Sequence, residues 1–137
     1  MNQLFINLPV SDAKASVKFY TGLGFVPNPL FTFEDQQCMA RGEEICLMLQ
    51  SKKMFSTGSS KALADPARFT NATFTLPVAS NALVDELMQN GLAAGGKEIG
   101  PPVTEDFMKM RNIEDPDGHH WSIICIDLPK FKELRGK

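Results

Sequence analysis

The sequence predicts an α+β protein in which two βαβββ modules follow one another and form a curved mixed sheet around a cleft, with the helices on its outer face. The main observation is an internal repeat: residues 76–78 (LPV) repeat residues 8–10 (LPV), and each copy ends a β-rich run that precedes a helical pattern. The chain has 137 residues, of which 43% are apolar, so it is long enough for one domain with a core. We therefore expect a single domain over residues 1–137, with modules at residues 1–50 and 69–137.

The first module begins with a β-rich run at residues 4–10. A helix follows, with Ser11 or Asp12 as the N-cap and Gly22 or Gly24 near its end. Three short β-like runs come next, at residues 25–33, 36–40 and 44–50, and the last two flank residues 41–43 at a spacing that suits a tight hairpin. The order of elements is therefore strand, helix and three antiparallel strands.

Residues 51–68 are expected to form a linker or flap between the modules. This segment is polar, and its four basic residues against one aspartate give it a net charge of +3. As a mobile flap it would favour anionic ligands, whereas as an ordinary basic loop it would only connect the modules.

The second module repeats the order of the first. A strand is expected at residues 69–78, a helix at 80–96, and strands at 97–100, 108–114 and 119–127. Residues 115–118 (DPDG) suit a β-turn before the last strand, because proline presets φ and glycine tolerates positive φ.

Composition excludes several classes of function. A net charge of −2 provides no basic field for nucleic acid. No stretch approaches the roughly 20 apolar residues of a membrane span, and the first residues do not resemble a signal peptide, so we expect a cytoplasmic protein with no membrane partner. Cys38, Cys46 and Cys125 are scattered among apolar residues, which is typical of buried free thiols.

The duplicated module order and the sequence EDPDGHHWSIICID at residues 114–127 resemble the vicinal-oxygen-chelate superfamily, which includes glyoxalase I, extradiol dioxygenases and bleomycin-resistance proteins. The similarity covers nearly the whole chain and is strongest to predicted lactoylglutathione lyase-like proteins. It implies the fold directly, but a fold alone does not fix a function.

The resemblance also implies where metal ligands would stand. Metal-dependent members place His, Gln or Glu on four strands facing the cleft, and the corresponding positions here are Phe5, Met48, Thr73 and Ser122. None of these is a normal ligand for a divalent ion. The two histidines, at positions 119 and 120, are adjacent on a predicted strand and so point to opposite faces. We therefore expect that the protein uses no metal ion and no other cofactor. The alternative is that it binds a divalent metal ion.

Strand periodicity then defines the surface of the cleft. Side chains two residues apart share a face, and Ile124 is expected on the face that lines the cleft. The residues expected to line the cleft and bind ligand are Phe5, Asn7, Cys46, Met48, Gln50, Thr73, Thr75, His120 and Ser122. Arg111 is a further candidate, because its guanidinium could anchor a carboxylate or phosphate. His120 is the candidate general acid or base, whereas the apolar neighbours of Cys46 do not favour a nucleophile.

These observations favour a metal-free protein that binds a small organic ligand, anionic or aromatic, in its cleft, as the resemblance to bleomycin-resistance proteins implies. The alternatives are a metal-dependent lyase or isomerase of the lactoylglutathione lyase type, or a metal-independent enzyme that uses His120 with Ser122 or Thr73. A homodimer is expected, because apolar edge strands favour association. The sequence leaves open whether one chain closes its own cleft or two chains share it.

Overall fold

The computed structural model describes residues 2–136, and its first module is built as the repeat predicts. The elements of this half are β1 (Leu4–Val10), α1 (Ala13–Gly22), β2 (Val26–Pro27), a 3-10 turn η1 (Pro29–Phe31), β3 (Gln36–Arg41) and β4 (Ile45–Ser51). Asp12 caps α1, since its carboxylate accepts hydrogen bonds from the backbone N–H groups of Lys14 and Ala15. The helix ends before Gly24, which has a φ of +93°.

The expected strand at residues 25–33 is mostly a turn. Val26 and Pro27 pair with β3, residues 29–31 form η1, and Phe33 makes an isolated bridge to Gln36. Pro29 has no N–H to donate to a sheet, and the side chain of Asn28 accepts a hydrogen bond from Leu30 N, which turns the chain out of the strand.

The second module contains β5 (Thr73–Pro77), α3 (Asn81–Ala93), β6 (Lys97–Glu98), β7 (Val103–Glu105), β8 (Met108–Glu114) and β9 (His120–Ile126). Ser80 caps α3 by accepting a hydrogen bond from Leu83 N. The expected strand at 97–100 is limited to two residues, and β7 is an addition that the sequence pattern did not predict; both pair with β8.

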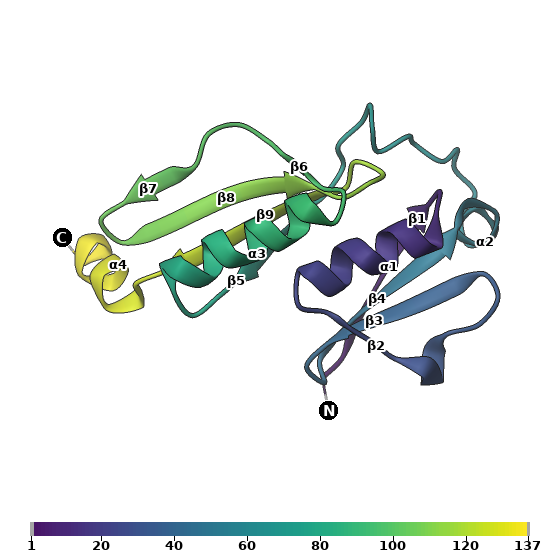
Figure 1. Ribbon diagram of the computed structural model, residues 1–137, viewed down its shortest axis with the longest axis horizontal. Coiled ribbons are helices and arrows are strands. Elements are labelled where there is room, and N and C mark those ends of the chain that lie inside the picture. The colour runs from purple at the N-terminus through teal and green to yellow at the C-terminus, as the bar shows by residue number, and fades with distance from the viewer. Residues whose placement is uncertain (1, 137) are drawn as a thin grey trace.

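The strands form two mixed sheets rather than one. The first has the order β1-β4-β3-β2, and the second has the order β5-β9-β8-β6, with β7 also paired to β8. In each module the first strand pairs in parallel with the last one, and the other pairs are antiparallel. Each sheet carries its helix on one face, and α1 and α3 lie side by side (Figure 1). The predicted α+β fold with two βαβββ modules is therefore confirmed.

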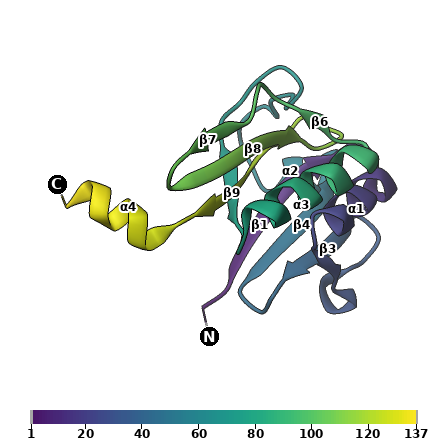
Figure 2. The ribbon, with the colours of Figure 1, turned by 60° about the vertical axis from the view of Figure 1, so that its left-hand side comes forward.

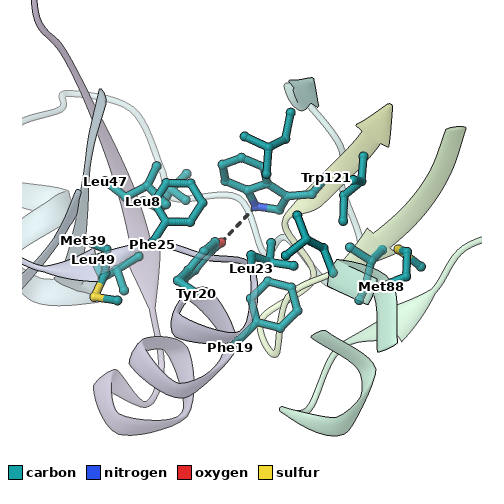
Figure 3. Close-up of a cluster of buried hydrophobic side chains, with 14 of the residues drawn as sticks. Leu8, Phe19, Tyr20, Leu23, Phe25, Met39, Leu47, Leu49, Met88 and Trp121 are labelled. Atoms are coloured by element: carbon teal, nitrogen blue, oxygen red, sulfur yellow. Dashed lines mark hydrogen bonds between the residues drawn. The ribbon is translucent and has the colours of Figure 1, made fainter. Parts of the chain in front are cut away.

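One hydrophobic core joins the two modules through their helices. Phe19 and Tyr20 of α1 and its C-cap residue Leu23 are fully buried and cluster with Met88 of α3 and Trp121 of β9 (Figure 3). The hydroxyl of Tyr20 donates to Asp115 Oδ2 at 2.6 Å and accepts a hydrogen bond from Trp121 Nε1 at 3.0 Å. These polar contacts tie the first module to the turn and last strand of the second.

Two helices lie where no helix was expected. α2 (Lys52–Thr57) occupies the start of the predicted linker, and Ser51 caps it by accepting a hydrogen bond from Met54 N. α4 (Leu128–Arg135) follows β9 and extends away from the rest of the chain (Figure 2). Asp127 caps α4, and Pro129 stands in its first turn, where a missing N–H costs nothing. Among the described residues, no helix is long and apolar enough to cross a bilayer.

Candidate functional site: the helix-free sheet faces

The face of each sheet that lies opposite its helix is called here the helix-free face. In the first sheet Phe5 pairs with Cys46, and Asn7 pairs with Met48. In the second sheet Thr73 pairs with His120, and Thr75 pairs with Ser122. Cross-strand partners share a face, and the intervening residues Leu8, Leu47, Leu76 and Ile123 belong to the core against the helices. The strand register therefore places the predicted cleft residues on the helix-free faces, while their binding role stays a prediction.

The second helix-free face holds a hydrogen-bonded group of three side chains. Asn112 on β8 accepts a hydrogen bond from Ser122 Oγ at 2.6 Å and lies 3.1 Å from His120 Nε2, in both cases through its Oδ1. Because Oδ1 can only accept, His120 Nε2 carries the hydrogen, and its Nδ1 is left as an acceptor in the neutral ring. The Asn112 amide thus offers hydrogen-bond donors on this face, and His120 Nδ1 offers an acceptor on the side of the ring away from Asn112.

The surroundings of this group suit a small organic molecule. His120 and Asn112 are half-buried, and Thr73 and Thr75 on the edge strand are exposed. Met108 and Met110, which share the face of Asn112 on β8, are half-buried. Flexible thioethers beside a few fixed polar groups are a common lining for ligand sites. The face therefore combines apolar area with polar groups whose orientation is already set.

The first helix-free face is largely covered. Cys38, Cys46 and Met48 form a small buried cluster against Phe31 of η1. The side chain of Gln50 is also buried and donates to Gln36 Oε1 at 2.8 Å. The expected amphipathic floor is thus closed at these positions by a turn that the sequence pattern had assigned to a strand. Only Phe5 and Asn7, of the predicted residues on this sheet, are exposed.

Burial also sets the chemistry of the cysteines. The pKa of the Cys38 thiol is raised to about 11, first by desolvation and then by the neighbouring Cys46. A thiol that stays protonated at neutral pH is a poor nucleophile. All three cysteines are free, and Cys125 is half-buried, so the expectation of free thiols is confirmed.

Arg111 does not join the other predicted residues. It lies on the helix side of β8, where its guanidinium donates to both carboxylate oxygens of Glu98 at 2.8 Å and to Asp85 Oδ1 at 2.9 Å. Lys109 also donates to Asp85. These pairs lower the pKa of both carboxyls, mainly through the hydrogen bonds from the basic groups. The fork of Arg111 is thereby occupied within the chain, because three of its five N–H donors are bonded to two carboxylates.

The four positions that the fold family implies as metal ligands do not fit a divalent ion. Phe5 makes an edge contact with Phe31, with ring centroids 5.4 Å apart, and Met48 is buried in the thiol cluster. Thr73 and Ser122 offer only neutral hydroxyls. His119, which precedes β9, bonds the carbonyl of Pro9, whereas His120 bonds Asn112. Within residues 2–136, no three His, Cys, Asp or Glu side chains are placed to hold one ion.

Comparison with solved structures identifies the fold. A hypothetical protein of S. aureus is 26% identical, with a TM-score of 0.77 over 91% of this chain and 94% of that one. A glyoxalase-related enzyme of Fulvimarina pelagi is 24% identical, with a TM-score of 0.76 over 91% and 88% of the two chains. A glyoxalase/bleomycin resistance protein/dioxygenase family enzyme of Burkholderia phytofirmans is 17% identical, with a TM-score of 0.75 over 92% and 99%.

The chain has the fold of the glyoxalase/bleomycin resistance/dioxygenase superfamily. No family model matches its sequence, and no curated protein does. At these identities the superfamily fold is shared, and the activity has to be argued from the chain's own side chains.

Sequence reasoning missed Asn112, which orients both His120 and Ser122. Strand periodicity contained the signal, because Asn112 is two residues from Met110 and pairs with Ser122. Asn112 lies on β8, which carries none of the four ligand positions that the superfamily implies. Gln36 was missed for the same reason, since β3 carries none of the four positions.

Proposed function

We propose that this chain binds a small organic ligand without a metal ion, on the helix-free face of its second sheet. The observation that carries the proposal is the hydrogen-bonded group of His120, Asn112 and Ser122. At the position where metal-dependent members of the superfamily carry a metal ligand, this chain has Ser122. Its hydroxyl donates to Asn112 Oδ1 and fixes the orientation of that amide. A ligand with an acceptor for the Asn112 amide hydrogens and a separate donor for His120 Nδ1, such as a hydroxy acid, matches this group.

The test combines metal analysis with ligand screening. We expect less than stoichiometric nickel, zinc, manganese or iron after incubation with each ion, and no thermal stabilisation by any of them. A fragment library screened by NMR should yield ligands that shift the Asn112 and His120 signals, and Asn112→Ala should weaken these ligands by about tenfold. Thr104→Ala, an exposed change on β7, is the control. One bound ion per chain, or fragments indifferent to Asn112, would refute the proposal.

The same observation favours a second candidate function, a metal-independent enzyme that uses His120 as a general base. The hydrogen bond to Asn112 holds the ring in the tautomer that leaves Nδ1 unprotonated, as proton abstraction requires. For any substrate found among the ligands, His120→Ala should lower kcat by at least about 100-fold. Unchanged kcat in His120→Ala would leave binding as the function.

A further inference from the structure

A pocket of about 360 Å³ lies beneath the segment that connects the two modules, here called the linker pocket. Its walls come from β1, α2, residues 59–72, the start of β5 and His119. Of the residues predicted to bind ligand, only Asn7 lines it, and the group of His120, Asn112 and Ser122 does not. The linker pocket is therefore distinct from the site of the proposed function, and the inference below does not depend on that function.

The linker is held in place over this pocket. Gly118 has a φ of +108°, and a Cβ built there would lie 2.6 Å from the carbonyl oxygen of Pro66, so the turn and the linker backbone are in close contact. Asp65 accepts hydrogen bonds from the N–H groups of Ala67, Arg68 and Phe69, which form a local turn. The pocket is thus preformed by backbone contacts, and a ligand would not have to order the linker.

The lining of the linker pocket is mostly apolar. Phe55, Leu63 and Phe74 contribute large side chains, together with several alanines and prolines. Phe69 also lines it and is 59% exposed, although it is a large aromatic residue. The guanidinium of Arg68 lies 5.7 Å from the centre of that ring. Exposed aromatic area at the mouth of a preformed pocket is typical of a binding site for a flat or aliphatic apolar group.

The charge of the pocket selects among apolar ligands. Lys61 lines it, and none of its described lining residues is Asp or Glu. Asn7, Asn71, Ser56 and Ser59 add neutral hydrogen-bonding groups. His119 Nε2 must donate to the Pro9 carbonyl at 2.9 Å, which fixes the ring. A cation without a neighbouring carboxylate favours a ligand that carries a negative charge.

We propose that the linker pocket is a binding site for small aromatic or aliphatic carboxylates. The apolar body of the ligand packs against Phe55, Leu63 and Phe74, and its carboxylate lies toward Lys61. The +3 charge of residues 51–68, in a chain of net charge −2, adds to the attraction of anions at this end of the molecule.

The experiment is a titration of the intact chain with 1-naphthoate, monitored by two-dimensional NMR, with the neutral 1-naphthylmethanol as its partner probe. We expect saturable shifts at Phe55, Phe69 and His119 with naphthoate below about 1 mM, and weaker binding of the alcohol. Lys61→Gln should weaken naphthoate by about three- to fivefold and leave the alcohol unchanged. Ala62→Trp, which fills the pocket from the exposed linker, should weaken both probes by more than about tenfold.

Matched controls separate this site from the helix-free face. Lys132→Gln on α4 removes a positive charge elsewhere, and Ala82→Trp adds the same bulk on the exposed side of α3. Neither change, nor Asn112→Ala, should alter the binding of naphthoate. No saturable binding, equal binding of acid and alcohol, or binding that is insensitive to Ala62→Trp would overturn the proposal. Shifts centred on Asn112 and His120 would overturn it too, and would support the proposed function instead.

Discussion

Removal of the Tyr20 hydroxyl would test how strongly polar contacts join the two modules. In Tyr20→Phe the ring remains, but Asp115 Oδ2 loses a donor at 2.6 Å, and the Trp121 N–H loses its acceptor at 3.0 Å. Asp115 keeps three backbone donors on its other oxygen. A hydrogen bond to a charged group contributes about 1.5–3 kcal/mol, and a buried donor without a partner costs about 1–3 kcal/mol. We expect the free energy of unfolding to fall by about 3 kcal/mol.

The assay is unfolding in urea, followed by the fluorescence of Trp121, the single tryptophan of the chain. Thr21→Val is a matched control, because it removes a hydroxyl that bonds only the exposed Val17 carbonyl within α1. The control should change the free energy of unfolding by less than about 0.5 kcal/mol. If the free energy of unfolding of Tyr20→Phe fell by no more than that of the control, the contacts of Tyr20 with Asp115 and Trp121 would not stabilise the junction.

The raised pKa of Tyr20 predicts that the protein loses stability at alkaline pH. Burial and then the Asp115 carboxylate raise the pKa of Tyr20 well above its ordinary value. Above about pH 10 the unfolded chain releases this proton while the folded chain keeps it, so the free energy of unfolding falls by about 1.4 kcal/mol per pH unit. Cys38, with its pKa raised to about 11, adds a similar slope to both proteins. The difference in stability between wild type and Tyr20→Phe should therefore shrink above about pH 10, and a constant difference would contradict the assignment.

Three further predictions concern packing, thiol reactivity and the ion pairs. A Cβ at Gly96 would lie 2.5 Å from the ring of Phe19, so Gly96→Ala should lower the melting temperature by the equivalent of about 1–3 kcal/mol, whereas Gly58→Ala should leave it unchanged. Iodoacetamide at about pH 8 should alkylate Cys125 long before Cys38, as mass spectrometry of digests would show; equal rates would contradict the burial of Cys38. Arg111→Met should lower stability by about 1 kcal/mol in urea without changing the binding of any fragment, and a loss of binding would restore Arg111 to the site.

Local patterns predicted most of the fold because both modules begin with the same order of strand, cap and helix and continue in antiparallel strands. Asp12 and the turn at residues 115–118 act as expected, since capping and turn chemistry depend on neighbours in the sequence. α2 was hidden within a polar segment because a six-residue helix leaves almost no periodic pattern. The split into two sheets was beyond reach as well, because it depends on how α1 packs against α3.

The candidate site was predictable as a face but not as a set of contacts. Strand alternation placed Thr73, His120 and Ser122 on one side correctly. It contained no information on the turn at residues 29–31, which covers Cys46 and Met48 from a distant position in the sequence. Strand alternation also did not distinguish the two faces of β8. Arg111 was therefore a candidate to bind ligand, although its partners Asp85 and Glu98 lie 26 and 13 residues away in the sequence.

The four positions that the fold family implies as metal ligands lie in unlike surroundings, so a single substitution would not create a metal site here. Phe5 lies against an aromatic ring, Met48 lies among buried thiols, Thr73 is exposed, and Ser122 serves a hydrogen-bonded amide. A histidine or glutamate at position 48 would bring a polar group into a buried apolar cluster, at a cost of roughly 1–3 kcal/mol without a partner. A carboxylate at position 122 would face Asn112 Oδ1, another acceptor, and would disrupt the contact that orients His120. Introducing metal binding would therefore require rebuilding both helix-free faces, because Phe5, Met48 and Ser122 make contacts that a ligand set would break.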